Sequence, residues 1–184
     1  MVETVSRDLP FFEVAPAMLI TWRETFVIDG GVIDDDHRFL FMNINTISRR
    51  LTERLPVSYL VKRTQDLRTF AALHFEREER LQEWAGYPDL PAHRREHQEL
   101  LARWDEILHG LQAEAATAVI AEPTEIKTFL LGWILDHMIL SDKKLKPFLS
   151  PLDSVGEAPL ATLKRRSLDR GAGTFFGGAK RRVA

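Results

Sequence analysis

Four segments of the chain place apolar side chains three or four residues apart, which is the spacing of one face of an α-helix. The pattern predicts helices over about residues 35–55, 58–84, from 91 onward, and 123–146. No segment shows the alternation at every second residue that a half-buried strand requires. The sequence therefore predicts an all-helical protein.

Prolines and polar side chains set the expected helix boundaries. Pro56 and Pro147 should end the first and last helices, because proline lacks the backbone N–H that continues a helix. Ser58 and Asp89 are the expected N-caps of the second and third helices, which a turn beginning at Gly86 separates. Four long amphipathic helices with short connections predict an up-down-up-down antiparallel four-helix bundle.

Both ends of the chain lack this periodicity. Residues 1–33 should form an arm that packs onto the bundle through Trp22 and Phe26. Residues 151–184 hold seven Lys or Arg against three Asp or Glu, together with five of the ten glycines. We therefore expect one bundle domain with its N-terminal arm over residues 1–150, followed by a basic, disordered C-terminal tail.

The composition narrows the functional class. The formal net charge of −2 favours neither nucleic acid nor an anionic membrane as a partner. The absence of cysteine excludes disulfides, thiolate metal sites and cysteine nucleophiles, and it suits a cytoplasmic location. No apolar stretch reaches the roughly 18 residues that span a bilayer, and no signal peptide is evident at the N-terminus.

Histidines and carboxylates interrupt the apolar faces of all four expected helices. Burying five imidazoles in a hydrophobic core costs free energy unless a ligand binds them, and so does burying a carboxylate without a partner. A bound metal ion explains both. The candidate ligands are His37, His74, Glu78, His93, His97, His137 and Asp142.

The spacing of these residues supports metal binding in two pairs, His93 with His97 and His74 with Glu78, and disfavours it in a third pair. His93 and His97 are four residues apart, so they lie one turn apart on the same helix face and can bind one ion. His137 and Asp142 are five apart, which in a regular helix turns their side chains away from each other by about 140°. The last helix must therefore tighten or bulge, or Asp142 must reach round from its end.

The donor types restrict the metal without fixing it. Imidazole and carboxylate donors without thiolate suit iron, manganese, zinc or copper. Seven ligands exceed the needs of one ion, so two ions are expected. If both carboxylates bridge and a solvent-derived oxo or hydroxo bridge joins the ions, one of twelve coordination positions stays open for an exogenous ligand.

Residues 20–150 resemble a bacterial hemerythrin, a non-haem di-iron oxygen-binding protein. The resemblance lies in ITW at 20–22, IDDDHRFLF at 33–41, HFEREERL at 74–81, YPDLPAHRREH at 87–97 and WILDHMILSD at 133–142. It implies a cofactor of two non-haem iron ions joined by an oxo or hydroxo bridge. One iron would be held by His93, His97 and His137, the other, with the open position, by His37 and His74, and Glu78 and Asp142 would bridge them.

The resemblance implies reversible binding of O2 for oxygen sensing, delivery or storage, and it favours a non-enzymatic protein. Trp133 and Ile134 would line the ligand pocket, while His109, near the end of the third helix, is expected to have a surface role. Two alternatives remain open at this point. The centre could be an enzyme acting on peroxide or nitric oxide, or a regulatory module whose arm or tail binds a protein partner. No residue is assigned a catalytic role.

Overall fold

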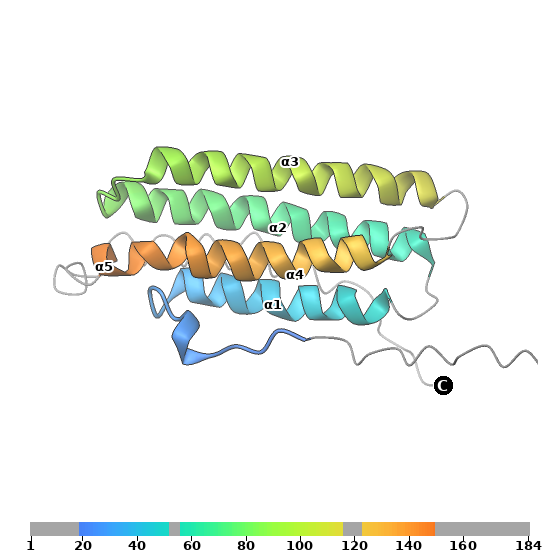
Figure 1. Ribbon diagram of the computed structural model, residues 1–184, viewed down its shortest axis with the longest axis horizontal. Coiled ribbons are helices and arrows are strands. Elements are labelled where there is room, and N and C mark those ends of the chain that lie inside the picture. Colours follow the sequence, from blue (N-terminus) through green and yellow to red (C-terminus); the bar gives the residue numbers. More distant parts are fainter. Residues whose placement is uncertain (1–18, 52–55, 116–122, 150–184) are drawn as a thin grey trace, which may run out of the picture.

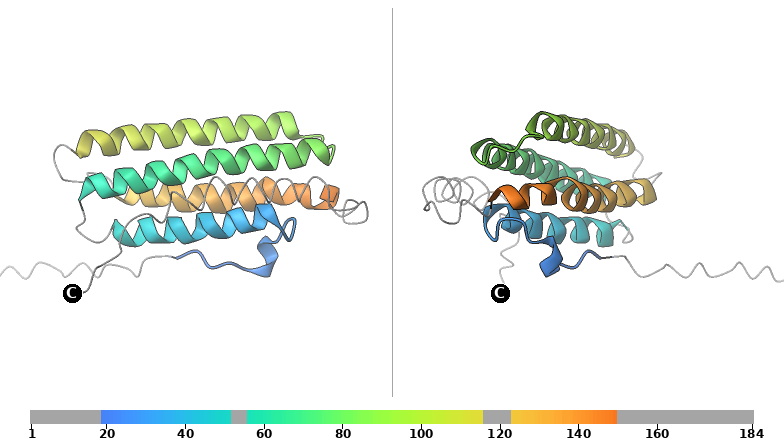
Figure 2. Two further views of the ribbon diagram at one scale, coloured as in Figure 1. Left: turned by 180° about the vertical axis from the view of Figure 1, so that it is seen from behind. Right: turned by 60° about the vertical axis from the view of Figure 1, so that its left-hand side comes forward.

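The computed structural model describes residues 19–51, 56–115 and 123–149. Its long helices are α1 (Val32–Arg50), α2 (Val57–Trp84), α3 (Leu90–Glu114) and α4 (Pro123–Leu140). Successive helices run antiparallel, with α2 packed between α1 and α3 and α4 packed on α1 (Figures 1 and 2). The predicted all-α antiparallel four-helix bundle is confirmed, and no strand occurs in these residues.

The first helix begins three residues earlier than the sequence suggested. The Asp29 carboxylate accepts N–H groups from Gly31 at 2.8 Å, Ile33 at 3.1 Å and Asp34 at 3.1 Å. These are amides at the helix start that have no partner within the helix. Asp29 therefore caps α1 from outside it, and the extra residues at the helix start include the buried Asp34.

The expected cap of the second helix is wrong. Pro56, with extended backbone, occupies the cap position of α2, and no side chain caps the helix there. The third helix begins one residue before Pro91, with Asp89 in the cap position. Asp89 acts through its backbone carbonyl, which accepts the N–H groups of Ala92 and His93 at 3.0 Å each, and no side-chain cap bond forms.

The fourth helix does not run unbroken to Pro147. After Leu140 the chain tightens into a 3₁₀ turn (Asp142–Leu145) and then forms the short helix α5 (Lys146–Leu149). Pro147 lies in the first turn of α5, where a missing N–H costs nothing, so it does not end the helical path. The tightening that the spacing of His137 and Asp142 required is present, and it is a 3₁₀ turn.

Aromatic rings attach the N-terminal arm to the bundle, as predicted. Trp22 and Phe26 both contact Phe41 of α1, with ring centroids 5.7 and 5.8 Å apart. The buried Asp34 carboxylate accepts the N–H groups of Ile28 at 2.9 Å and Gly30 at 2.7 Å, which ties the arm to the start of α1. The arm thus closes the end of α1 that carries His37.

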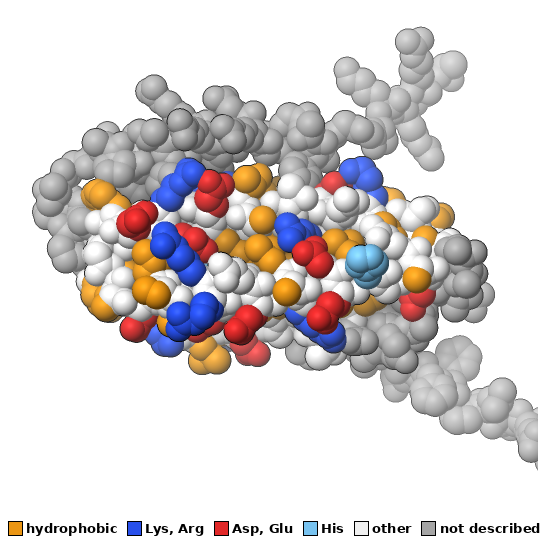
Figure 3. Space-filling view, turned by 90° about the horizontal axis from the view of Figure 1, so that it is seen from above, with side chains coloured by type: hydrophobic (Ala, Val, Ile, Leu, Met, Phe, Trp, Pro, Cys, Tyr) orange, Lys and Arg blue, Asp and Glu red, His pale blue; other side chains and the backbone are white. Residues whose placement is uncertain are grey.

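The outer face seen in Figure 3 mixes acidic and basic side chains with scattered apolar ones. None of the described helices is long and apolar enough to cross a membrane. The predicted basic tail, residues 151–184, and the domain boundary at residue 150 lie outside the described residues and stay predictions.

Candidate metal centre

The structure brings all seven predicted ligands together near one end of the bundle, and every one of them is buried. They form two groups, in each of which the donor atoms lie within 4.8 Å of one another. The larger group is Glu78, His93, His97, His137 and Asp142. The smaller group is His37, His74 and Asp142. Asp142 belongs to both.

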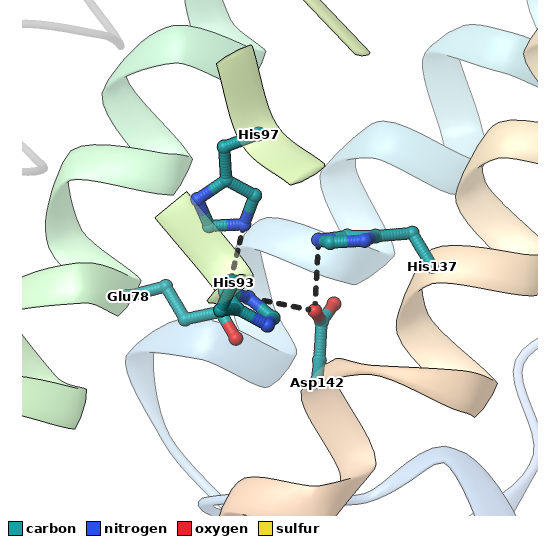
Figure 4. A group of neighbouring side chains, drawn as sticks. All are labelled: Glu78, His93, His97, His137 and Asp142. Carbon is teal, nitrogen blue, oxygen red and sulfur yellow. Dashed lines mark ion pairs between the residues drawn. The ribbon is translucent and has the colours of Figure 1, made fainter. Parts of the chain in front are cut away.

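Asp142 lies between the two groups because the chain turns tightly after α4. Its Oδ1 is 3.0 Å from His137 Nε2 and 3.4 Å from His93 Nε2. Its Oδ2 is 3.2 Å from His37 Nε2. In Figure 4 the carboxylate rises from the chain below α4 toward the histidines of α3 and α4. One carboxylate can therefore serve a metal ion on each side.

Glu78 is arranged differently. Its Oε2 lies 3.4 Å from His97 Nε2, 3.5 Å from His93 Nε2 and 3.9 Å from His74 Nε2. Its Oε1 accepts a hydrogen bond from the side-chain amide of Gln82 at 3.2 Å. A single oxygen of Glu78 therefore faces the histidines, whereas Asp142 offers one oxygen to each group.

Further carboxylates stand behind three of the histidines. Asp36 lies 3.4 Å from His74 Nδ1, and Glu96 lies 3.5 Å from His137 Nδ1. Glu79 lies 2.8 Å from His97 Nδ1. A carboxylate in this place fixes the ring orientation and leaves Nε2 free to bind a metal. Sequence reasoning did not assign these residues, although each is adjacent in sequence to a predicted ligand.

The electrostatics of the centre keep both inner carboxylates ionised. Burial alone would raise the pKa values of Glu78 and Asp142. The neighbouring imidazoles of His93 and His97 outweigh burial at Glu78, and those of His137 and His37 do so at Asp142, so both pKa values are lowered. Two buried negative charges among imidazoles form a site for a cation.

Phe75 covers the centre on its apolar side. Its ring stacks on His97 with centroids 3.8 Å apart, and it contacts the rings of His74, His137 and Trp133 at 5.5, 5.7 and 6.1 Å. Phe75 follows His74 directly in the sequence, but the helical pattern alone did not single it out. Both predicted pocket residues are buried, Trp133 at 5% exposure and Ile134 at 2%.

A surface groove of about 500 Å³ between α3 and α4 reaches the edge of the centre at His137. Trp133 lines this groove and Ile134 does not. The groove is therefore not the ligand pocket that the sequence predicts beside both residues. Glu96, Glu99 and Asp136 give the groove an acidic border. His109 is exposed and belongs to neither group of donor atoms.

The donor atoms themselves test whether metal fits this site. Most of them are buried and have no hydrogen-bond partner: His37 Nε2, His93 Nε2, His97 Nε2, His137 Nε2, Glu78 Oε2 and Asp142 Oδ1. Leaving one such group unpaired costs about 1–3 kcal/mol, more where it is charged. Six orphaned nitrogen and oxygen atoms converging on one interior are accounted for if each binds metal, and the donor set suits iron.

The sequence matches the model of the hemerythrin HHE cation-binding domain over residues 31–149, which is more than half of its length. The chain belongs to the hemerythrin family. The match begins at the start of α1 and ends at the last residue of α5, so it covers the whole bundle and every residue of the centre.

Known hemerythrins resemble the chain over most of their own length. The bacteriohemerythrin of Stenotrophomonas maltophilia is 29% identical over 122 residues, which cover 65% of this chain and 74% of that protein. That of Methylococcus capsulatus is 26% identical over 133 residues, 72% of this chain and 98% of that protein. The myohemerythrin of Sipunculus nudus is 25% identical over 125 residues, 68% and 89% of the two chains. The cofactor of this family is a pair of non-haem iron ions, and the buried donor set fits it.

Proposed function

We propose that the protein binds O2 reversibly at a di-iron centre for oxygen sensing, delivery or storage. In this proposal His93, His97 and His137 hold the first iron and His37 and His74 hold the second. Glu78 and Asp142 would be the carboxylates shared by the two irons, and the open coordination position would be on the second iron. When bound, the two irons supply the electrons and the coordination position that O2 requires.

The observation that carries the proposal is the unequal supply of donors at two neighbouring positions in a buried site. Five protein residues surround the first position and only three surround the second. The second position thus has room for an exogenous ligand. The buried Phe75 and Trp133 rings place apolar surface beside the centre, and an apolar pocket slows loss of a charged, reduced ligand to solvent.

Protein side chains also orient the imidazoles. Asp36 and Glu79 are themselves held by arginines, Arg77 at 2.7 Å and Arg94 at 3.2 Å. A ring whose Nδ1–H donates to a fixed carboxylate cannot rotate its Nε2 out of the centre. A cytoplasmic location, inferred from the absence of cysteine, is part of the proposal.

The test is optical spectroscopy of the iron-loaded protein with metal analysis. About two irons per chain are expected, and the anaerobically reduced protein should be nearly colourless. Air should produce a charge-transfer band that argon removes again over repeated cycles. Irreversible oxidation within seconds of mixing, with turnover of peroxide or nitric oxide, would replace the carrier proposal with an enzymatic one. A lone, tightly held zinc would contradict both.

A further inference from the structure

The seven ligands of the centre are not equally shielded from solvent. His137 is 8% exposed, whereas the other six are between 0% and 3% exposed. Of the seven, His137 alone lines the groove between α3 and α4. Its Nε2 is buried without a hydrogen-bond partner, 3.0 Å from Asp142 Oδ1, and in Figure 4 the ring extends from α4 toward that carboxylate. Its Nδ1 lies 3.5 Å from Glu96, which lines the groove. The ring therefore has one nitrogen toward the centre and the other toward a groove residue.

Three carboxylates border the groove. Glu96 and Glu99 are three residues apart on α3 and so share one helix face, and Asp136 precedes His137 on α4. Within the described part of the chain, neither Glu99 nor Asp136 forms a salt bridge. Arg103, the basic residue of the lining, forms its own ion pair with Glu106 at 2.7 Å. Two carboxylates of the border are thus available to a cation from solvent.

The groove is also left open at Gly132, in the interior of α4. Glycine weakens a helix interior relative to alanine, and the backbone does not require it here, since the positive-φ glycines of the described chain are Gly30 and Gly86. Close packing does not require it either, because a Cβ at this position would meet only the Asp136 carboxylate, at 3.9 Å. What the missing side chain does is keep this turn of the groove unfilled.

We propose that this groove is the entry route of divalent metal ions, with Glu96, Glu99 and Asp136 as a transient cation-binding site and His137 as the ligand that receives the ion. The inference rests on the ligand assignment of the proposed function. It adds the path by which ions reach a centre whose ligands are all buried.

Electrostatics and geometry both favour this path. A cleft lined by charge of one sign, with walls of low dielectric constant, raises the local concentration of counter-ions and speeds association about 10- to 1000-fold. Leu100, Phe129 and Trp133 supply the apolar wall. Rotation of the single His137 side chain then brings Nε2 to the groove, whereas a route past the six more deeply buried ligands requires a larger opening of the bundle. A route speeds uptake and release alike, so it leaves the equilibrium affinity unchanged.

The experiment follows Co²⁺ uptake by the full-length metal-free protein in a stopped-flow spectrometer, because Co²⁺ accepts the same donors and absorbs visible light. The test variant combines Glu99→Gln with Asp136→Asn and keeps Glu96, which orients His137. The matched control, Glu24→Gln with Asp66→Asn, removes the same charge from outside the groove. The test variant should load about tenfold more slowly at low ionic strength. The difference should shrink in roughly 1 M salt, where the Debye length is about 3 Å.

The control should load at the wild-type rate, and the dissociation constants should stay within about twofold of wild type in both variants. A steric pair tests the same route without changing charge. Gly132→Leu places a side chain in the groove and should slow uptake severalfold, in high salt as in low salt. Gly132→Ala, whose Cβ meets no atom closer than 3.9 Å, should load like the wild type.

Wild-type uptake rates in the test variant and in Gly132→Leu would overturn the inference. Equal slowing in the charge-matched control would overturn it as well, since the effect would then belong to the net charge of the molecule. Weaker equilibrium binding in the test variant would make Glu99 or Asp136 a ligand and not part of a route. Faster uptake in the destabilised variant Leu111→Ala would show that ions enter through opening of the bundle. Since Co²⁺ uptake needs no oxygen, slowed loading stands even if reversible O2 binding fails, and O2 binding can hold if ions enter elsewhere.

Discussion

The two halves of this bundle are built on opposite principles. The metal half, formed by the seven proposed ligands with Asp36 and Gln82, buries charged and polar side chains. The apolar half, around Ile44, Leu60, Trp104, Leu111 and Leu130, is filled by hydrocarbon and aromatic groups apart from the buried hydroxyls of Ser48 and Thr64. The same four helices run through both halves, so the difference lies in the side chains and not in the backbone.

The comparison shows where stability and function reside. Burial of apolar side chains in the apolar half stabilises the fold with no ligand at all. The metal half buries two carboxylates and several orphaned nitrogens, which destabilise the metal-free protein until a cation binds them. Bound metal therefore stabilises the native state through linkage, and it does so from one end of the molecule.

The largest expected effect comes from removing a ligand in the metal half. His97→Ala deletes a donor from the first metal position and takes away the ring on which Phe75 stacks. We expect iron to fall to one per chain or less. Hydrogen exchange should become faster in the end of α2 and the start of α3, while amides in the apolar half stay protected. Metal analysis and exchange mass spectrometry check both points.

Leu111→Ala is the converse change, in the apolar half of the same helix α3. Leu111 is 2% exposed, and its truncation should lower the free energy of unfolding by about 2–5 kcal/mol. The iron content should nevertheless stay at two per chain. If Leu111→Ala loses iron as readily as His97→Ala, the two halves are not separable and the comparison is wrong.

A second change probes the border between the halves. Ile134 lies one turn before His137 on α4 and is buried. Ile134→Ala should create a cavity costing about 2–5 kcal/mol of unfolding free energy. If Ile134 lines the ligand pocket with Trp133, as predicted, the variant should also admit water and oxidise faster after oxygenation. Stopped-flow spectroscopy measures that rate.

The matched control is Ile126→Ala, which removes the same side chain about two turns earlier in α4, in the apolar half, where Ile126 is 6% exposed. It should lose stability yet oxidise at the wild-type rate. Equal oxidation rates in the two variants at equal iron content would mean that Ile134 only packs the bundle.

A third effect, moderate in size, is a pH dependence confined to the metal-free protein. Burial would lower the pKa of His137, but the neighbouring Asp142 carboxylate, together with the charges of Glu78 and Glu96, raises it from 6.5 to about 9. Protonated His137 thus contributes stability that is complete below pH 6.5 and disappears as the pH rises through 9. The melting temperature of the metal-free protein should fall across that window.

The iron-loaded protein should not show this fall, because a metal-bound imidazole is neutral at every pH of the window. The lowered pKa of His74 acts only below pH 6.5 and does not oppose the trend. In metal-free Asp142→Asn the slope should flatten, since the partner charge is gone. An undiminished slope in that variant would assign the titration to another group.

Much of this architecture was predictable because periodicity and donor chemistry are local properties of a sequence. The four helices follow from the spacing of apolar residues, and the ligands follow from histidines on faces that should be apolar. The cap of α1 was missed because Asp29 acts from two residues before the helix cap, and the end of α4 was missed because a 3₁₀ turn leaves no periodic pattern.

The surroundings of the centre were less predictable, for a geometric reason. Asp36, Glu79 and Glu96 are each one residue from a ligand, so in a helix they are rotated by about 100° from it and reach histidines on other helices. Gln82 does continue the face of His74 and Glu78 at a spacing of four, and that pattern could have revealed it. Which of its neighbours it would bond, and with which oxygen, depends on packing that a single sequence does not encode.

The smallest expected effect belongs to the one histidine outside the centre. His109 is exposed on α3, close to Gly110 and beyond the apolar contacts of Trp104. It shares the helix of His93 and His97 but lies more than three turns past His97, about 18 Å along the axis. His109→Ala should therefore keep two irons per chain, the wild-type spectrum and a free energy of unfolding within about 0.5 kcal/mol. Metal analysis and a denaturant melt check this, with His93→Ala as the variant that must lose iron. Loss of one iron in His109→Ala would mean that a histidine outside the metal half binds metal, and the ligand assignment would then be wrong.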